Sequence, residues 1–336
     1  MTEATLEERT ARVREESAFV GPLLKEIERT IVGQDEMVRR ILIGLLADGH
    51  LLLEGVPGLA KTLAVKTVAQ TIHATFHRVQ FTPDLLPADL TGTLVFDPKT
   101  GAFTPKLGPV FTEILLADEI NRAPAKVQSA LLEVMQEHQV TIGHETFPVP
   151  DPFLTLATQN PIESEGTYPL PEAQIDRFML KILIGYPSHD EELTIVQRQL
   201  EPHPELREQL SLDDLKTLQG AVAGIYVDPA LVSYAVDLAT ATRRPDNELA
   251  EYIAFGASPR GPISLVQASR ALALIHGRDY VVVDDLRALA KDAFRHRLVL
   301  SYQALAEEVS ADTILDRVIE QVPLPQVDLS ARTSAA

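Results

Sequence analysis

The chain has 336 residues and a net charge of −18 at pH 7, and 23% of its residues are charged. Hydrophobic residues make up 45%, which is enough for one large core or two smaller ones. The acidic balance disfavours nucleic acid as a partner, and the lack of tryptophan disfavours stacking platforms for single strands. The lack of cysteine excludes disulfides, thiolate metal sites and thiol catalysis.

The N-terminal region is polar, and residues 1–17 lack the apolar stretch of a signal peptide. The longest apolar runs, such as residues 41–47, are too short to cross a bilayer. We therefore expect a cytoplasmic protein with no membrane span.

Strand and helix patterns alternate in the first part of the chain. Short apolar segments predict strands at residues 51–53, 76–81, 113–117, 153–158 and 179–184. Helical spacing follows the first strand at residues 63–71 and follows the third strand after Pro124. This alternation predicts a parallel sheet with helices on both faces.

Two polar-tipped segments interrupt the alternation. Residues 93–105 and 140–149 each predict a β-hairpin, and we expect both to project from the edge of the sheet.

From Asp190 onward the pattern is helical. Predicted helices cover residues 190–200, 212–223, 229–244, 262–276 and 284–300, with Asp213, Asp228 and Asp284 as N-cap or first-turn acids. The change of pattern predicts an α/β domain over residues 1–187, a helical domain over 188–330, and a disordered tail over 331–336.

The turn between the first predicted strand and helix has the composition of a phosphate-binding loop. It reads Gly55-Val56-Pro57-Gly58-Leu59-Ala60-Lys61-Thr62, followed by Leu63. Glycines let backbone N–H groups turn toward phosphates, and the helix N-terminus adds partial positive charge. Lys61 would reach the β- and γ-phosphates of ATP, and Thr62 would ligate Mg²⁺. Ala60 replaces the usual glycine, and its Cβ atom predicts an ordinary, negative φ.

A second chemical segment is the apolar run 114–117, which ends in Asp118 and Glu119. An apolar strand ending in two acids places the carboxylates at the edge of the sheet where ligands bind. Asp118 would hold Mg²⁺ through water, and Glu119 would orient and polarise the attacking water.

Further polar residues have the chemistry to complete such a site. Asn160, after the fourth strand, could bond the attacking water or the γ-phosphate, or only cap the turn before Pro161. Arg177 and Arg260 could neutralise charge that develops in phosphoryl transfer, with Arg122 as a weaker candidate. Taken singly, each arginine is as consistent with a surface ion pair.

Together these segments resemble the AAA+ ATPases, and within them the MoxR family. The resemblance extends from Ile31-Val32-Gly33-Gln34 to the helical domain. It rests on residues 54–62, 117–124, 157–161, 165–174 and 256–260. MoxR-like proteins also carry alanine in the phosphate-binding loop, as Ala60 does here.

The resemblance implies a role for each motif residue. Lys61 and Thr62 belong to Walker A, Asp118 and Glu119 to Walker B, Asn160 to sensor 1, Arg177 to the arginine finger, Arg260 to sensor 2, and Val32, Gly33 and Gln34 to the adenine site. The hairpins resemble the helix-2 and pre-sensor-1 insertions. Family membership further implies a hexameric ring of identical chains, a chaperone-like role, and in many cases a partner with a von Willebrand factor A-type domain.

We therefore expect a P-loop AAA+ core with β-hairpin insertions and an all-α lid, with ATP bound between them. Hydrolysis in a ring would remodel a protein client that the sequence does not identify. The alternatives are a DNA-acting motor of the helicase type, a metal-chelatase ATPase subunit, and a nucleotide-gated scaffold that binds ATP without turnover. Basic, pore-facing hairpins would favour the DNA motor, whereas the hairpins here offer only Lys99, Lys106 and His144.

Overall fold

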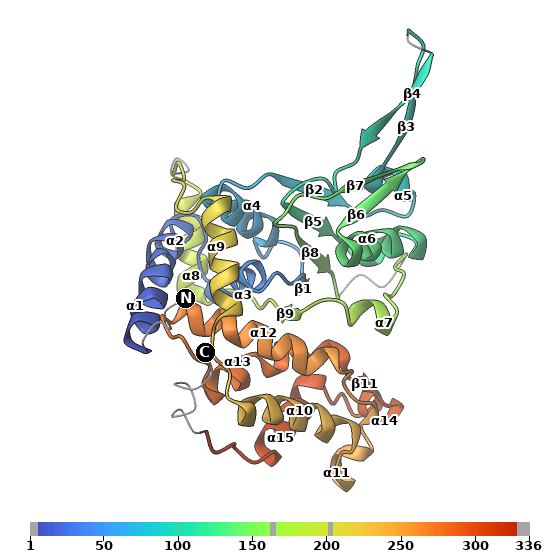
Figure 1. Cartoon of the computed structure of the whole chain (residues 1–336). Helices are drawn as coiled ribbons and strands as arrows, with labels where there is room; N and C mark the ends of the chain where they lie inside the picture. Colours follow the sequence, from blue (N-terminus) through green and yellow to red (C-terminus); the bar gives the residue numbers. More distant parts are fainter. Residues whose placement is uncertain (1–5, 100, 162–165, 201–203, 328–336) are drawn as a thin grey trace.

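A computed structural model describes residues 6–99, 101–161, 166–200 and 204–327. It contains a parallel β-sheet with helices on both faces, and a mostly helical domain packed beneath it (Figure 1). The tail predicted over residues 331–336 lies outside the described residues.

Among the described residues, five strands form the central sheet in the order β2-β5-β8-β1-β9, and every neighbouring pair is parallel. These strands are β1 (Leu51–Glu54), β2 (Phe76–Gln80), β5 (Ile114–Asp118), β8 (Leu154–Gln159) and β9 (Leu180–Leu183). All five predicted strands are confirmed to within one or two residues at each end. Their spatial order differs from their chain order, so β1 lies between β8 and β9, the last two strands of this sheet in the chain.

Alternating side chains of the sheet enter two apolar cores. Leu51 and Leu53 point into one core with α3 (Asp35–Leu46) and α4 (Lys61–Thr71), whereas Leu52 points into the other with α6 (Ala125–Glu137). Helices α1 (Leu6–Glu16), η1 (Ser17–Phe19) and α2 (Val20–Glu28) extend the first layer, and α5 (Pro87–Thr91) extends the second. The alternation explains why the central strands are apolar along their whole length.

Both predicted hairpins are confirmed. They are β3 (Gly92–Asp97) with β4 (Ala102–Leu107), and β6 (Gln139–Ile142) with β7 (Glu145–Pro148). They project from the same end of the sheet, and the β3–β4 hairpin reaches well beyond the rest of the molecule (Figure 1). The two hairpins touch, because the Leu94 side chain lies over Gly143 in the turn of the second hairpin.

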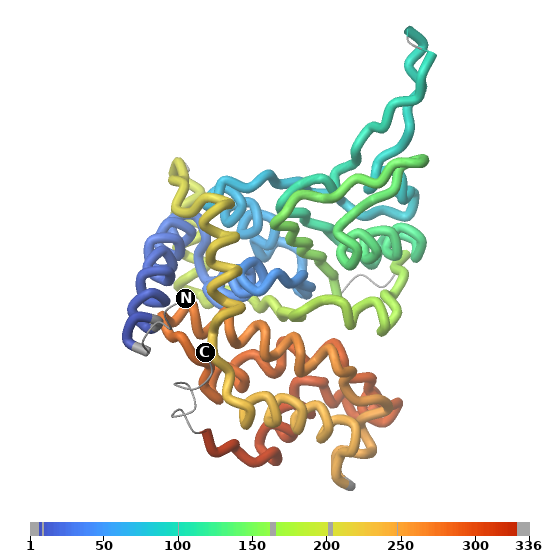
Figure 2. The backbone as a smooth tube through the Cα atoms, viewed as in Figure 1, coloured from blue at the N-terminus to red at the C-terminus, as the bar shows by residue number. Residues whose placement is uncertain are grey.

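The helical part contains α8 (His189–Arg198), α9 (Leu212–Ala223), α10 (Pro229–Arg243), α11 (Asn247–Ala250), α12 (Arg260–Ile275), α13 (Val283–Phe294), α14 (Tyr302–Ala306) and α15 (Ala311–Gln321). Side-chain caps start several of them. Asp228 caps α10 as predicted, whereas Ser211 is the cap of α9 and Asp213 lies in its first turn. Helices α10, α12, α13 and α15 pack together as a lid below the sheet (Figure 2).

One predicted helix is wrong at its end. The helix expected over residues 284–300 stops at Phe294, and Arg295–Arg297 form a short 3₁₀ turn, η3. Beyond it, β11 (Val299–Leu300) pairs antiparallel with β10 (Ile253–Phe255), so the lid is not purely helical. The helix ends because Arg295, His296 and Arg297 turn toward carbonyl groups of the sheet domain, a long-range contact that periodicity does not report.

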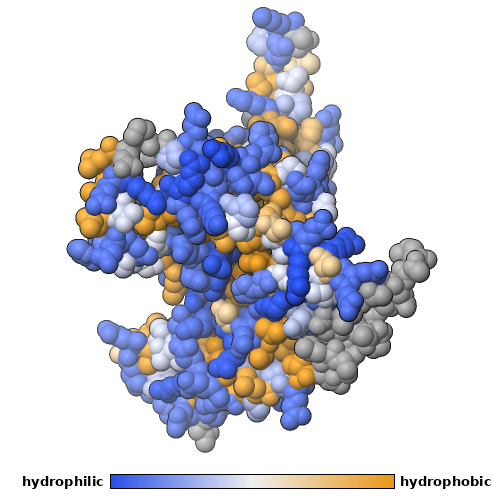
Figure 3. Space-filling model, turned by 90° about the vertical axis from the view of Figure 1, so that its left-hand side faces the viewer, coloured by the Kyte–Doolittle hydropathy of each residue, from blue (hydrophilic) through white to orange (hydrophobic). Residues whose placement is uncertain are grey.

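The predicted division at residue 187 remains a prediction. Helix α9 contacts α1 and α3 of the sheet domain as well as α12 of the lid, and Arg198 of α8 donates a 2.6 Å hydrogen bond to the Glu28 carbonyl. Hydrophilic residues cover most of the side that Figure 3 shows, with hydrophobic ones in small separate patches. In the described part of the chain, no helix has the length and apolarity to cross a bilayer.

Candidate functional site

The turn between β1 and α4 has the shape of a phosphate-binding loop. Gly58 has φ +87° and Ala60 has φ +56°, both in the left-handed region. The expectation of a negative φ at Ala60 is wrong. Since α4 starts at the next residue, the chain must reverse at Ala60, and the left-handed conformation costs an alanine about 1–2 kcal/mol.

Lys61 begins α4 and lies half-buried under this loop. Its Nζ donates a 2.5 Å hydrogen bond to the carbonyl oxygen of Gly55. Burial lowers the pKa of the Lys61 amine, and the carboxylates of Asp118, Glu119 and Glu54 oppose that shift. The amine therefore lies close to three carboxylates while it is bonded to the loop backbone.

The acid pair lies directly beside the loop because of the strand order. Strand β5, which ends in Asp118, pairs with β8, and β8 pairs with β1. The Gly55 N–H donates to the Gln159 carbonyl at 3.3 Å, which joins the ends of β1 and β8. The carboxyl ends of three adjacent parallel strands thus converge on one point.

Asp118 is nearly buried and held from two sides. The Thr158 hydroxyl donates a 2.6 Å hydrogen bond to its Oδ1. Arg78 of β2 donates to its Oδ2 from Nε at 3.0 Å and from Nη2 at 2.7 Å. The same Thr158 oxygen accepts the Glu119 N–H at 2.8 Å, so one hydroxyl bridges the two acids.

Glu119 has a strained backbone, with φ +55° and ψ +51°. Its Oε2 accepts hydrogen bonds from Gln80 Nε2 at 2.7 Å and Arg122 Nη1 at 3.0 Å. Left-handed non-glycine residues persist where the surroundings impose them, and they are frequent at active sites. The Glu119 side chain is 21% exposed, whereas Asp118 is buried.

The other predicted residues divide into two groups. Asn160 is buried immediately after β8, next to the ends of β1 and β5, and Thr62 lies in the first turn of α4. Arg177 and Arg260 do not join them. Arg177 precedes β9, which runs parallel to β1, and a four-residue strand spans about 13 Å.

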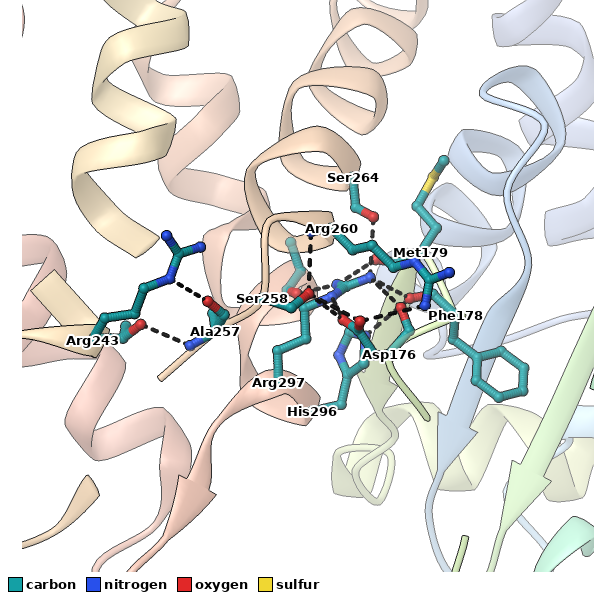
Figure 4. A network of polar contacts seen from close by, with 12 residues as sticks. Asp176, Phe178, Met179, Arg243, Ala257, Ser258, Arg260, Ser264, His296 and Arg297 are labelled. Carbon is teal, nitrogen blue, oxygen red and sulfur yellow. Dashed lines mark hydrogen bonds and ion pairs between the residues drawn. The ribbon is translucent and has the colours of Figure 1, made fainter. Parts of the chain in front are cut away.

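The two arginines lie instead near the amino-terminal end of β9, whereas the phosphate-binding turn follows the carboxyl end of β1. Arg177 Nη1 donates to the Leu132 carbonyl of α6 at 3.1 Å. Arg260 begins α12 of the lid, and its Nη1 lies 3.5 Å from the Asp176 carboxylate (Figure 4). Neither arginine is in position to contact a phosphate bound above Lys61 of the same chain.

A cavity of about 400 Å³ opens beside the loop. Thr30, Val32 and Gln34 line one side, and Ile195 and Arg198 of α8 line the other. Gly58, Ala60 and Leu63 also line it, so the cavity adjoins the phosphate-binding turn. Of the predicted adenine residues, Val32 and Gln34 line this cavity. Gly33 lies between them with φ +71°, against the Glu191 side chain.

These features fit ATP with Mg²⁺. A mostly apolar cavity of nucleoside size adjoins a loop whose left-handed residues, Gly58 and Ala60, stand at a helix N-terminus. Mg²⁺ prefers oxygen ligands together with water and substrate phosphates, and the Thr62 hydroxyl and the Asp118 carboxylate would offer such oxygens, that of Asp118 through water.

Three residues of this site were not predicted from the sequence. Arg78 and Gln80 alternate on β2, so both face the acids at the end of β5, and Thr158 bridges those acids. The two-residue spacing of Arg78 and Gln80 on a strand indicates that their side chains share one face of the sheet. The spacing alone does not predict contact with Asp118 and Glu119, because the sequence does not tell which strand lies next to β2.

Comparisons with known proteins agree with this geometry. The model of the ATPase family associated with various cellular activities (AAA) matches residues 50–180, and the model of the AAA lid domain matches residues 247–318. The chain is 54% identical over 307 residues to Chaperone MoxR1 of Mycobacterium tuberculosis, covering 90% of this chain and 81% of that protein.

Two further proteins are similar over almost their whole length. The chain is 43% identical over 309 residues to YeaC of Bacillus subtilis, covering 91% of this chain and 95% of that protein. The crystal structure of a "putative ATPase" from Cytophaga hutchinsonii superposes with a TM-score of 0.88 at 44% identity, covering 95% of this chain and 98% of that one.

Proposed function

The chain belongs to the MoxR family of AAA+ ATPases, and from that premise we propose that it hydrolyses ATP as one subunit of a hexameric ring and thereby remodels protein complexes. One observation carries the proposal. The lysine of the phosphate-binding loop and the two acids at the end of β5 meet at the carboxyl ends of adjacent strands, beside a nucleoside-sized cavity.

The residues around that point divide the chemistry among them. Lys61 would neutralise charge on the β- and γ-phosphates, and Thr62 and Asp118 would hold Mg²⁺, with Asp118 acting through water. Bound Mg²⁺ would offset the charge that develops on the phosphate oxygens. Glu119 would orient the attacking water once it leaves Gln80 and Arg122, and Asn160 would report whether the γ-phosphate is present.

The position of the arginines supports a ring. Arg177 and Arg260 lie near the amino-terminal end of β9, away from the phosphate-binding loop of their own chain. Each would therefore act on the nucleotide of a neighbouring chain. In that contact, one surface of a chain meets a different surface of the next copy. Such a contact is heterologous and can close into a ring. The active site would then be complete only between two subunits.

A protein client is favoured over DNA by the projecting β3–β4 hairpin. Its exposed side chains include Leu94, Val95, Phe96 and Phe103, and the two phenylalanine rings pair across the strands with centroids 5.3 Å apart. Apolar surface of this kind binds apolar polypeptide segments, whereas a phosphate backbone requires cations. A chaperone-like role, with or without a partner bearing a von Willebrand factor A-type domain, is therefore the proposal, and the M. tuberculosis relative carries the name chaperone.

Nucleotide binding and turnover test the proposed chemistry. Lys61→Ala should abolish ATP binding, whereas Glu119→Gln should bind ATP and retain it without turnover. Arg177→Ala should assemble and bind ATP but lose about a thousandfold in turnover, and mixing it with Lys61→Ala protein should restore part of the activity. Normal turnover by Glu119→Gln would refute the role of Glu119, and an absence of rescue in mixed rings would refute the trans arrangement.

The client proposal needs its own measurement. Glu119→Gln protein loaded with ATP is used to capture polypeptides, in parallel with the same protein carrying Phe96→Ser and Phe103→Ser. The hairpin substitutions should remove the captured polypeptides and leave ATP binding unchanged. Tight, salt-sensitive binding of short DNA at two salt concentrations would instead favour a DNA motor.

A further inference from the structure

The short segment that carries Arg177 is held by the lid. Residues 176–179 join α7 (Glu172–Ile175) to β9, and Arg177 lies inside this segment. In Figure 2 the light-green chain of this region runs directly above the orange and red helices of the lid. Its acceptor groups face that lid, as Figure 4 shows around Asp176.

Arg297 of η3 makes most of these contacts. Its Nη2 donates to the carbonyl oxygens of Asp176 at 3.0 Å and Phe178 at 2.7 Å, and its Nη1 donates to that of Met179 at 3.2 Å. Its Nε donates to Asp176 Oδ1 at 2.8 Å. A single guanidinium thus binds both the backbone of the segment and the carboxylate at its start.

Arg297 is anchored on the lid side as well. The same guanidinium donates to the Ser264 hydroxyl at 3.1 Å and to the Ala293 carbonyl, so all five of its N–H donors face acceptors. Its side chain is 1% exposed. Burial lowers the pKa of Arg297 to about 10, and Asp176 opposes that shift, so the group stays protonated at neutral pH.

Asp176 connects this contact to the second arginine. Its carboxylate accepts from the Ser258 hydroxyl at 2.8 and 2.9 Å and lies 3.5 Å from Arg260 Nη1. Next door, His296 Nε2 donates to the Phe178 carbonyl at 3.0 Å. Asp176 therefore ties the start of α12, which carries Arg260, to the segment that carries Arg177.

We propose that Arg297 is a positioning residue that fixes Arg177 and Arg260 relative to each other, so that both approach the neighbouring subunit's nucleotide as one rigid unit. This inference rests on the proposed function of a ring with arginines acting in trans. Arg297 itself touches neither ATP nor water in that arrangement. It acts because three carbonyls around Arg177 and the carboxylate beside Arg260 converge on its planar fork of donors.

The test is Arg297→Lys, which keeps a positive charge beside Asp176 but loses the fork that reaches several acceptors at once. Displacing a catalytic group by about 1 Å can reduce turnover by about a hundredfold. We therefore expect kcat to fall by about tenfold to a hundredfold. The KM for ATP should stay within about twofold, because Arg297 lies away from the subunit's own loop.

The matched control is Arg278→Lys. Arg278 is also a lid arginine and binds both oxygens of Asp285, at 2.6 and 2.8 Å. Its other side-chain hydrogen bonds to described residues, with Tyr280 and His276, also lie within the lid. The same substitution there should leave kcat near the wild-type value. A loss of comparable size in both variants would mean that any weakened lid ion pair has this effect, and it would overturn the proposal.

Mixed rings separate positioning from folding. Arg297→Lys subunits keep an intact phosphate-binding loop, and Lys61→Ala subunits keep intact arginines, so mixing them should restore activity above the sum of the two alone. If Arg297→Lys does not fold, Asp176→Asn takes its place, with the same expected loss of kcat and the same rescue. Wild-type kcat in the folded variant, or no rescue on mixing, would overturn the inference.

The failure of this inference is distinguishable from failure of the proposed function. If Arg177→Ala is rescued by Lys61→Ala protein but Arg297→Lys turns over ATP normally, the trans arrangement is supported and only the positioning role of Arg297 is refuted. If Arg177→Ala itself keeps full turnover, the proposal that Arg177 completes the neighbouring active site in a ring is refuted.

Discussion

Arg78 and Asp118 form a two-donor ion pair across neighbouring strands, with Nε and Nη2 of Arg78 at 3.0 and 2.7 Å from one oxygen of Asp118. The carboxylate that would hold Mg²⁺ is thus already bound to a cation. The Arg78 side chain is 48% exposed, so solvent screens the interaction.

Replacing Arg78 should ease magnesium binding. In Arg78→Gln, the guanidinium no longer competes for Asp118, and the Mg²⁺ concentration that gives half-maximal ATPase activity should fall by about threefold, the effect of a screened pair worth about 0.7 kcal/mol. Lys126→Gln, which removes an exposed cation from α6, should leave the Mg²⁺ requirement unchanged. An unchanged or higher requirement in Arg78→Gln would contradict the competition.

Thr158 should contribute to both stability and turnover. In Thr158→Val, Asp118 loses a buried donor and the Glu119 N–H loses its acceptor, so the free energy of unfolding should fall by about 1–3 kcal/mol. Turnover should fall as well, because the Thr158 hydroxyl fixes the positions of both Asp118 and Glu119. Denaturant unfolding and steady-state ATPase assays measure the two effects.

The same strand offers a control. Thr155 is also buried on β8, but its hydroxyl has no hydrogen-bond partner among the residues that the structure describes. Thr155→Val removes an unpaired polar atom at constant shape, so it should be neutral or slightly stabilising. Equal losses in Thr155→Val and Thr158→Val would argue against a special role for the Thr158 bridge.

Because Ala60 has a left-handed backbone, we expect glycine to be tolerated there and a β-branched residue to weaken ATP binding. Ala60→Gly relieves backbone strain but adds freedom to the unfolded chain, so the free energy of unfolding should change by less than about 1 kcal/mol and ATP binding should persist. Ala60→Val places a β-branched residue in that conformation and should weaken ATP binding by about tenfold or more.

An alanine with ordinary surroundings serves as the comparison. Ala125 is exposed in the first turn of α6, and Ala125→Val should leave ATP affinity unchanged. Fluorescent nucleotide titration measures all three variants. If Ala60→Val binds ATP as tightly as the wild type, the loop does not require the left-handed turn for phosphate binding.

Two buried histidines should make the fold sensitive to mild acid. Burial lowers the pKa of His50 to about 4 and places that of His296 well below its usual 6.5. In the unfolded chain each takes up a proton below about pH 6.5, whereas the folded chain excludes it. The stabilisation is therefore present above pH 6.5 and is lost as the pH falls below that value; for His50 the loss is about 2 kcal/mol at pH 5.

His50→Gln isolates one of the two contributions. His50 accepts the Thr155 N–H at Nδ1 and donates to the Met135 carbonyl from Nε2, so the variant should be less stable at pH 7. The slope of unfolding free energy against pH, measured by urea denaturation between pH 5 and 6.5, should be smaller by about one proton. An unchanged slope would show that His50 does not exclude its proton in the folded chain.

Local patterns in the sequence determined much of this protein. Apolar runs predicted the five strands of the central sheet. The positions of Lys61, Asp118, Glu119 and Asn160 at or after strand ends predicted a nucleotide site, because a residue's distance from the end of its strand is a local property. The resemblance of the same segments to MoxR-like ATPases gave the family, which the comparisons bear out.

Only the tertiary structure decided which strand ends meet and which do not. The order β2-β5-β8-β1-β9 brings Arg78 to Asp118 and leaves Arg177 on the far edge, and the turn after Phe294 brings Arg297 to the segment around Arg177. These contacts join residues far apart in the chain, and no periodicity encodes them. They depend on strand pairing and on burial of charged groups that must find partners, which the whole fold decides.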